Sequence, residues 1–573
     1  MQDNSPPLLE TWCSWIVQEL ISHQVVYFCI APGSRSTPLV CAISNHPQAQ
    51  SFIHFDERAL GFHALGFAKA SKKPVAILVT SGTAVGNLLP SIMEAHESCI
   101  PLIILTADRP SELQDCGANQ TTYQEGIFNH FVRWQQTLPH PDSSFSKSYI
   151  QTTIAQAIFK ASTDYKGPVH LNCQLREPFF TSSFNPPLEN FLSQKPYVTL
   201  VPSQKNLYPN NCKELASLIN SSKQGIILLG YETFHTQDDL SSFYKLSQKL
   251  NWPILADVLS GLGNHPLSIG HCDLFKEILL PDCVLHFGGP FVSKEVLAFL
   301  KKSPISHYLH IASSPKRQDP AHLNTHRLQL NPLDFCLQIE PYLEQKPQQP
   351  KLQNLHKTIQ IETSSFFEKT PQFTEPHIFH LLKDFNFSSY SLFLANSMPI
   401  RDASHFFHCD FPPKMIYGNR GLSGIDGNIA TAVGIAKAIN HPMLAILGDQ
   451  TFLHDLNSLS QVKCLNHPLI ILVFNNHGGA IFTHLPIYEK KELCETYFVA
   501  SHDLNFESAA NLFKLPYKNY ISLEAFKEEF STILHSSKHY LVECTTCKED
   551  NLHTRQELKK YLATHVKHQL LWQ

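Results

Sequence analysis

The stretch GDQTFLHDLNSLSQVKCLNHPLIILVFNN, residues 448–476, joins two apolar runs that each end in polar residues. The first run, Met443–Leu447, precedes it and the second, Leu469–Phe474, lies near its end, as is typical of buried parallel strands. The apolar residues between the runs keep a helical spacing, so the stretch predicts a strand–helix–strand unit. Such a unit places Asp449 and Asn476 at the carboxyl ends of neighbouring strands, where open α/β sheets bind ligands.

Asp449 and Asn476 together offer the oxygen ligands that a hard divalent cation prefers. A carboxylate, an amide oxygen and nearby backbone carbonyls suit Mg²⁺, which keeps its other positions for water and a substrate phosphate. For these residues taken alone, the alternative is a pair of polar strand ends in an ordinary doubly wound domain.

Composition limits the classes of protein that remain. A chain of 573 residues predicts about three or four domains. Its net charge of −4, without a basic stripe, gives no reason to expect a nucleic-acid partner. The amino terminus lacks a basic leader, and no apolar run approaches the length of a membrane span, so we expect a soluble, cytoplasmic protein.

The fifteen cysteines are scattered, odd in number and mostly set in apolar runs. This pattern favours buried, reduced thiols over a disulfide framework. Cys544 and Cys547 form the one tight CxxC pair, and without a second pair they do not predict a zinc site.

The first predicted domain, residues 1–187, contains a loop that is suited to anions. A strand ending near Ile30 runs into Pro32–Pro38, which predicts a loop that opens a helix. Backbone N–H groups at such a helix start attract anions, and Ser34 and Arg35 add side-chain donors. The alternative is plain N-capping by a Ser or Thr of this loop beside an exposed arginine.

Glu57 stands at the start of a predicted helix, on or near its apolar face. A carboxylate in that position is unusual unless it has a partner. The alternative is an ordinary glutamate that is favoured by the helix dipole.

The middle domain, residues 188–360, alternates predicted helices and strands but lacks the G-x-G-x-x-G fingerprint, so we expect no nucleotide there. A polar, proline-bearing linker is predicted at residues 340–355. The third domain, residues 361–573, contains a glycine-rich loop at residues 418–427 that lets backbone approach a ligand closely.

Two doubly wound domains flanking a third, with the helix-start glutamate in the first and Gly-Asp…Asn-Asn in the third, resemble the pyruvate-oxidase-like thiamine-diphosphate enzymes. Within that group the chain is similar to the 2-succinyl-5-enolpyruvyl-6-hydroxy-3-cyclohexene-1-carboxylate (SEPHCHC) synthases of menaquinone biosynthesis. The motifs that carry the resemblance are PGSRSTPL (32–39), HFDERALGF (54–62), TSGTAVGNLLP (80–90), TADRP (106–110), DCGANQ (115–120), GNRGLSGIDG (418–427) and NNHGGAIF (475–482).

The resemblance implies an α/β fold of three doubly wound parallel-sheet domains. Residues 1–187 would form the pyrimidine-binding domain, 188–360 a central Rossmann-like domain, and 361–573 the diphosphate-binding domain. It also implies a homodimer or a dimer of dimers, in which Glu57 of one subunit faces the diphosphate site of the other.

The resemblance further implies roles for individual residues. Asp449, Asn476 and the backbone carbonyl of Gly478 would bind Mg²⁺ or Mn²⁺, which holds the cofactor diphosphate. Glu57 would hydrogen-bond the aminopyrimidine ring as the catalytic group that promotes its imino tautomer. Ile425 and Phe482 would line the cofactor pocket. Polar substrate contacts would come from Ser34, Arg35, Arg109, Asn119, Gln120, Lys294, Ser397, Arg401 and Arg420.

The implied reaction decarboxylates 2-oxoglutarate on thiamine diphosphate and adds the succinyl unit to isochorismate. Both substrates carry two carboxylates, which guanidinium groups match well. Two positions differ from the family pattern: Gln450 stands where glycine is common, and Glu295 follows Lys294 where some relatives carry a second base.

Two other functions compete with this prediction. One is another thiamine-diphosphate lyase or carboligase, such as a 2-oxo acid decarboxylase or an acetolactate-synthase-like enzyme, which needs fewer arginines at the rim. The other is a catalytically silent binding scaffold, against which the presence of Glu57, Asp449 and Asn476 argues.

Overall fold

The computed structural model describes residues 8–163, 165–180, 195–231, 233, 237–262, 279–348, 350–407 and 411–571. The chain divides into two compact units. Unit 1 comprises Met1–Ser203, Asn419–Asn440 and Leu453–His467, and unit 2 comprises Gln204–Gly418, His441–Phe452 and Pro468–Gln573. The predicted boundary between residues 187 and 188 lies outside the described residues.

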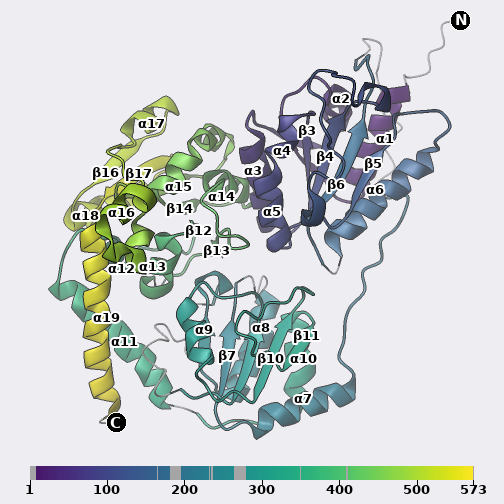
Figure 1. Ribbon diagram of the computed structural model, residues 1–573. Coiled ribbons are helices and arrows are strands. Elements are labelled where there is room, and N and C mark those ends of the chain that lie inside the picture. The colour runs from purple at the N-terminus through teal and green to yellow at the C-terminus, as the bar shows by residue number, and fades with distance from the viewer. Residues whose placement is uncertain are drawn as a thin grey trace, which may run out of the picture. The chain divides into compact units, whose positions relative to one another are not determined.

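Unit 1 contains a six-stranded parallel sheet in the order β2-β1-β3-β4-β6-β5, of which β3, β4, β5 and β6 are labelled in Figure 1. Its strands are β1 (Tyr27–Ile30), β2 (Gln50–Ile53), β3 (Val75–Val79), β4 (Leu102–Asp108), β5 (Gln135–Leu138) and β6 (Val169–Gln174). The chain direction across the sheet reverses between β1 and β3, and the loops that follow these strands therefore flank a crevice at their carboxyl ends.

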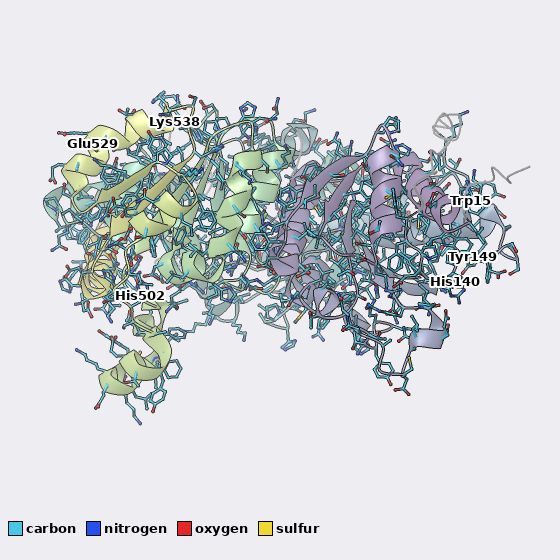
Figure 2. All side chains as sticks on the ribbon, turned by 90° about the horizontal axis from the view of Figure 1, so that it is seen from above. Trp15, His140, Tyr149, His502, Glu529 and Lys538 are labelled. Carbon is cyan, nitrogen blue, oxygen red and sulfur yellow. The ribbon has the colours of Figure 1, made fainter. Side chains whose placement is uncertain are left out.

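Helices cover both faces of this sheet. They are α1 (Leu8–Ser22), α2 (Thr37–Asn45), α3 (Glu57–Ser71), α4 (Thr83–Gly86), α5 (Leu89–Glu97) and α6 (Lys147–Ser162). Alternate strand residues enter different cores: Phe28 and Leu78 pack with α1, α2 and α6, while Cys29 and Ile77 pack with α3 and α5. The α1–α6 side also carries an aromatic cluster around Trp12, to which Trp15 and Tyr149 belong (Figure 2).

Two segments from the carboxyl-terminal third of the chain belong to unit 1. They form helix α14 (Asn428–Ala438) and the 3-10 helix η7 (Leu456–Cys464). Helices α3 and α14 approach closely because glycines face backbone: a Cβ on Gly66 would lie 2.2 Å from the carbonyl oxygen of Thr431, and one on Gly434 would lie 2.1 Å from that of His63.

Unit 2 contains two parallel sheets. The five-stranded sheet, in the order β11-β10-β9-β7-β8, is built from β7 (Gly225–Leu229), β8 (Ile254–Ala256), β9 (Cys283–Phe287), β10 (His307–Ala312) and β11 (His326–Gln329). The six-stranded sheet, in the order β13-β12-β14-β15-β17-β16, is built from β12 (Ser391–Leu394), β13 (Ile416–Tyr417), β14 (Met443–Gly448), β15 (Leu469–Asn475), β16 (Tyr517–Tyr520) and β17 (Tyr540–Thr545). The six-stranded sheet repeats the strand order of the sheet in unit 1, and its reversal point lies between β12 and β14.

The helices that accompany these sheets are α7 (Pro209–Ser221), α8 (Gln237–Leu250), α9 (Lys294–Leu300), α10 (Pro332–Ile339), α11 (Pro350–Lys369), α12 (Glu375–Leu382), α13 (Met398–Phe406), α15 (Asp449–His454), α16 (Lys491–Cys494), α17 (Glu507–Leu512), α18 (Leu523–Leu534) and α19 (Lys548–Leu571). One core of unit 2 joins Ile226 of the five-stranded sheet to Leu392 and Ile446 of the six-stranded sheet.

The fold class is confirmed, and two local predictions need correction. The predicted helix between β14 and β15 is α15 followed by η7, with Asp455 between them. The predicted linker at 340–355 is partly helical, because α11 already begins at Pro350.

Within the residues that the structure describes, no helix is both long enough and apolar enough to cross a membrane.

Candidate functional site

The carboxylate of Asp449 lies at the carboxyl end of β14, beside the end of its neighbour β15. Its Oδ1 accepts a hydrogen bond from the backbone N–H of Gln450 at 2.6 Å. Its Oδ2 accepts from the N–H groups of Asn476 at 3.1 Å and Gly478 at 2.9 Å. Burial raises the pKa of Asp449 to about 7, although these N–H donors favour the charged form.

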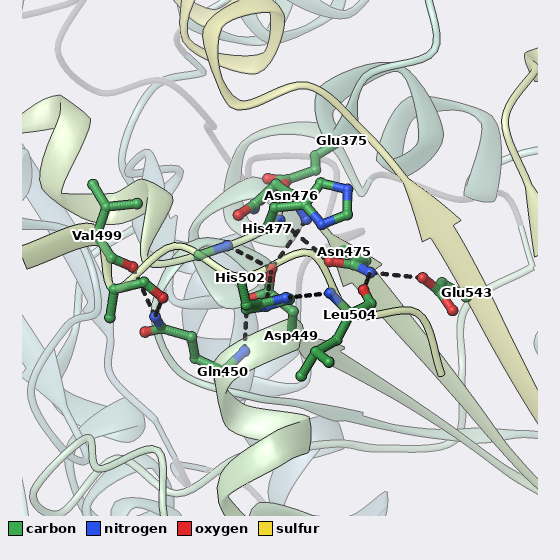
Figure 3. A network of polar contacts seen from close by, with 12 residues as sticks. Glu375, Asp449, Gln450, Asn475, Asn476, His477, Val499, His502, Leu504 and Glu543 are labelled. Carbon is green, nitrogen blue, oxygen red and sulfur yellow. Dashed lines mark hydrogen bonds and ion pairs between the residues drawn. The ribbon is translucent and has the colours of Figure 1, made fainter. Parts of the chain in front are cut away.

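The two asparagines at the end of β15 have different surroundings (Figure 3). Asn475 is fully satisfied: its Nδ2 donates to Glu543 Oε1 at 2.7 Å and to the carbonyl of Leu504 at 2.8 Å, and its Oδ1 accepts from His477 N–H. Asn476 donates through Nδ2 to Glu375 Oε1 at 2.6 Å, but its buried Oδ1 has no hydrogen-bond partner. A buried carbonyl oxygen without a partner is costly unless a ligand completes it.

This oxygen and the Asp449 carboxylate fit the ligand set of a magnesium-like cation. The chemistry is that of hard oxygen donors in a buried, negatively charged place, which suits Mg²⁺ or Mn²⁺. In the described ranges, no three His, Cys, Asp or Glu side chains gather as a metal cluster, so a cation here would depend on amide and backbone oxygens as well.

The turn after β15 is shaped by Gly478 and Gln450. Gly478 has φ +150°, and a Cβ there would lie 2.7 Å from the carbonyl oxygen of Val499. Gln450, which stands where the family often has glycine, donates through Nε2 to the carbonyls of Val499 at 2.8 Å and Ala500 at 3.3 Å. The side chain of Gln450 thus anchors the neighbouring loop and leaves the Asp449 carboxylate in place.

A buried charge cluster lies behind Asn476. The second oxygen of Glu375 accepts from Arg555 Nη2 at 2.6 Å, and Arg555 Nε donates to Asp402 at 2.9 Å. Burial raises the pKa of both carboxyls, whereas the Arg555 guanidinium favours their ionised forms. Despite its own burial, the two carboxylates raise the pKa of Arg555.

The same cluster borders a cavity of about 580 Å³ in unit 2. Three residues that the sequence singled out, Lys294, Arg401 and Phe482, line this cavity together with Arg555. Burial and the positive charges of Arg555 and Arg401 lower the pKa of His484, on the cavity wall, to about 4. The cavity lining also includes Lys559 and the carboxylates Glu295 and Asp402, so its wall carries more cationic than anionic side chains among apolar ones.

Two further predictions fall beside this cavity. Ser397 is the N-cap of α13, with φ +73°, and its carbonyl accepts a hydrogen bond from Arg401 Nη1. Glu295, where some relatives carry a base, lies 3.4 Å from Lys559 of α19.

In unit 1, Glu57 is the first residue of α3 and is half-buried. Asp56 caps the helix by accepting from the N–H groups of Arg58 and Ala59. Glu57 Oε2 accepts from Asn87 Nδ2 at 3.3 Å. The capping is therefore done by Asp56, and Glu57 is left with one weak partner.

Unit 1 also brings two buried arginines together at the crevice of its sheet. Arg35 donates to the carbonyl of Leu175 at 2.6 Å, and its buried Nε has no partner. Arg109 contacts Ser81 Oγ and donates to the carbonyl of Gln120 at 2.7 Å. Burial and the nearby charge of Arg109 lower the pKa of Arg35, whereas the carboxylate of Glu177, 3.5 Å from Arg35 Nη2, acts in the opposite sense.

The remaining predicted residues of unit 1 are more open. Ser34, Asn119 and Gln120 are exposed on the loops after β1 and β4, and Ile425 is 36% exposed on the glycine-rich loop. Arg420, on the same loop, is half-buried. Sequence reasoning missed Glu94 of α5, whose carboxylate holds this loop by accepting from the N–H groups of residues 421 and 422.

Sequence reasoning also missed Glu375, Asp402 and Arg555. Their partners lie 101 to 180 residues away along the chain, so no local spacing marks them. A basic residue on an otherwise ordinary carboxyl-terminal helix, such as Arg555, gives no signal in one sequence.

Three family models match the chain. Residues 11–131 match "Thiamine pyrophosphate enzyme, N-terminal TPP binding domain", residues 183–394 match "Middle domain of thiamine pyrophosphate", and residues 399–544 match "Thiamine pyrophosphate enzyme, C-terminal TPP binding domain". Thiamine pyrophosphate is the same compound as thiamine diphosphate.

Similar curated proteins include three SEPHCHC synthases. That of Rubrobacter xylanophilus is 34% identical, over 98% of this chain and 100% of the relative. That of Chlorobium phaeobacteroides is 33% identical over 98% of each chain, and that of Shewanella putrefaciens is 35% identical over 93% of this chain and 94% of the relative. Among solved structures, benzoylformate decarboxylase from Polynucleobacter necessarius has a TM-score of 0.72 at 17% identity, covering 94% of this chain and 98% of that one, which shows the shared fold.

Proposed function

Because the chain belongs to the SEPHCHC synthase family of thiamine-diphosphate enzymes, we propose that it joins the succinyl part of 2-oxoglutarate to isochorismate in menaquinone biosynthesis. The C1–C2 bond of 2-oxoglutarate breaks and CO₂ leaves. C2 then forms a new bond to the ring double bond of isochorismate by 1,4-addition, with uptake of a proton. When bound, thiamine diphosphate supplies the nucleophilic carbon and accommodates the electron pair left by CO₂.

The observation that carries this proposal is the unpaired Oδ1 of Asn476 next to the buried Asp449 carboxylate. We assign Asp449, Asn476 and the Gly478 carbonyl as ligands of Mg²⁺ or Mn²⁺, which would hold the cofactor diphosphate. Burial raises the pKa of Asp449, and a divalent cation bound beside this carboxylate would lower that pKa and favour the ionised form.

Glu57 is the proposed catalytic carboxylate, hydrogen-bonding the aminopyrimidine ring and exchanging its proton. Its weak contact with Asn87 leaves its acceptor capacity available for that partner. Phe482 and Ile425 are proposed to line the cofactor pocket.

The substrate carboxylates are proposed to bind at cationic places in both units. Arg35 and Arg109 form one such place in unit 1, with Ser34, Asn119 and Gln120 on the loops beside them. Lys294 and Arg401, at the cavity of unit 2, form another, with Ser397 beside them. Arg420 on the glycine-rich loop is proposed as a further contact. Guanidinium groups match planar carboxylates better than point charges do, which suits two dianionic substrates.

The proposal includes the family's assembly, a homodimer or dimer of dimers in the cytoplasm. Glu57 then serves the diphosphate site of the partner subunit. Light scattering of the purified chain measures the mass, and a monomer with full activity would contradict this part.

The function is tested by a substrate-omission assay with thiamine diphosphate and Mg²⁺. Loss of isochorismate is followed with 2-oxoglutarate present, absent or replaced by pyruvate. The proposal predicts that isochorismate is consumed only when 2-oxoglutarate is present. Equal consumption with pyruvate would instead support another thiamine-diphosphate carboligase, and no thermal stabilisation by cofactor and Mg²⁺ would support a binding scaffold.

A further inference from the structure

The orientation of the Asn476 amide decides whether the residue can serve a cation. With Nδ2 turned to Glu375, the carbonyl Oδ1 is left unpaired and buried. If the amide were turned by 180°, its NH₂ group would occupy that place, and an NH₂ group cannot ligate a cation. Something must therefore hold the amide in one orientation.

Glu375 has the chemistry to do so. It is 1% exposed and begins α12, where the helix dipole favours its carboxylate. Its backbone N–H donates to Asn551 at 2.9 Å, and its two carboxylate oxygens accept from Asn476 and Arg555, both at 2.6 Å. A carboxylate that already accepts from a guanidinium offers its other oxygen only as an acceptor, so the amide must present its N–H.

Arg555 is fixed in turn by Asp402. It donates Nε at 2.9 Å to Asp402 Oδ1 and also contacts Oδ2, so that one guanidinium ties two buried carboxylates. Arg555 also lines the cavity that carries Lys294 and Arg401. A series of side-chain hydrogen bonds, Asp402–Arg555–Glu375–Asn476, thus connects the cavity wall to the end of β15.

We propose that Glu375, held by Arg555 and Asp402, is a positioning residue that locks the Asn476 amide with its carbonyl oxygen available to the divalent cation. This inference rests on the proposed function, because it needs the metal site at Asp449 and Asn476. It assigns a role to a glutamate that the sequence motif does not contain. Partners of metal ligands commonly change metal affinity by about 10- to 100-fold when they are replaced.

Asn475 provides the internal comparison. Its amide is also held by a buried glutamate, Glu543, at 2.7 Å, but its Oδ1 accepts from the N–H of His477. Glu543 therefore stabilises the turn after β15. It does not orient an oxygen that is available to a cation. The substitution Glu543→Gln is a matched control for Glu375→Gln.

The test measures binding of Mn²⁺ to the full-length chain with saturating thiamine diphosphate, by electron paramagnetic resonance of the free ion. Glu375→Gln should weaken Mn²⁺ binding by about 10- to 100-fold, because glutamine can present either oxygen or NH₂ to Asn476 and so permits both amide orientations. Glu543→Gln should lower thermal stability and leave Mn²⁺ affinity unchanged. Equal affinity in Glu375→Gln and the wild type would overturn the inference, as would an equal loss in both variants.

A reciprocal exchange keeps the test decisive even if Glu375→Gln alone does not fold. In Asn476→Asp, two carboxylates face each other; in Glu375→Gln/Asn476→Asp, the glutamine NH₂ donates to one aspartate oxygen and leaves the other for the cation. The double variant should bind Mn²⁺ more tightly than Asn476→Asp, and equal or weaker binding would overturn the inference. If the wild type itself bound no Mn²⁺ in the presence of thiamine diphosphate, that result would contradict the proposed metal site, on which the role of Glu375 depends.

Discussion

Glu57 is the residue whose role depends most on its being a carboxylate. Its helix is already capped by Asp56, and Glu57 Oε2 accepts only a long hydrogen bond, of 3.3 Å, from Asn87 Nδ2. The carboxylate is therefore not needed to begin α3, and a structural role would be served as well by glutamine.

We predict that Glu57→Gln folds normally and lowers turnover by about 10²- to 10⁴-fold, because glutamine keeps the volume and cannot exchange a proton. Turnover and thermal midpoint are measured together. Glu125→Gln, which changes an exposed glutamate of the same unit, is the control and should keep wild-type turnover. Near-normal turnover in Glu57→Gln would remove the assigned role.

The limits of the sequence are clearest at the two asparagines. Their position after an apolar run, and the position of Asp449 after another, could be predicted because parallel strands bring their carboxyl ends to one edge. Which asparagine keeps a free oxygen could not, because Glu375 and Glu543 reach them from 101 and 68 residues away.

At the scale of elements, the contact between α3 and α14 depends on the absence of side chains. Gly66 of α3 lies against the backbone of α14 at Thr431, and Gly434 of α14 lies against the backbone of α3 at His63. The many small residues between Asn428 and Ile439 are typical of a helix that packs closely against a neighbour, but one sequence could not reveal that neighbour.

Gly434→Ala should therefore destabilise the fold by about 1–3 kcal/mol, the usual cost of overpacking a tight core, even though alanine favours helix. Urea unfolding followed by circular dichroism measures it. Gly86→Ala, at a helical glycine with nothing within 4 Å of the added Cβ, should be neutral or slightly stabilising. Equal stability of the two variants would mean that α3 and α14 do not meet as described.

The strands that were predicted correctly are those with strong apolar runs, such as β14 and β15. Short or polar edge strands, including β2 (QSFI) and β5 (QQTL), were not predicted, because an edge strand is half-exposed and carries no continuous apolar signal. The long helix α19 was also missed, although its buried Leu558, Leu562 and Val566 lie four residues apart, a spacing typical of an amphipathic helix.

For the whole molecule, buried neutral histidines set the response to acid. Burial, the main cause at each position, lowers their pKa values to about 3 or 4, at His63, His170, His286, His377 and His484. Below pH 6.5 the unfolded chain binds protons at these histidines, whereas the folded chain does not. Their contribution to the free energy of unfolding is therefore fully present above pH 6.5 and is lost as the pH falls toward 4. Burial also raises the pKa values of four carboxyls, to about 7 at Asp449, to about 6 at Asp455, and also at Glu375 and Asp402; these act in the opposite sense but are fewer than the five histidines.

We predict that the free energy of unfolding falls steadily between pH 6.5 and pH 4, measured by urea unfolding without added cofactor. His286→Gln should reduce that slope by up to about 1.4 kcal/mol per pH unit, because it removes one group that protonates only on unfolding. A wild-type stability that stays flat or rises over this range would contradict the assignment of these histidines as neutral.

The central claim is that the polar edge at Asp449 and Asn476 belongs to an enzyme that transfers the succinyl part of 2-oxoglutarate to isochorismate. The most direct measurement incubates the chain with thiamine diphosphate, Mg²⁺, isochorismate and 2-oxoglutarate labelled with ¹³C at every carbon, and weighs the products by mass spectrometry. The account predicts one labelled CO₂ and an adduct of isochorismate that carries the other four labelled carbons. An adduct with all five, or no labelled adduct while labelled CO₂ is released, would contradict it.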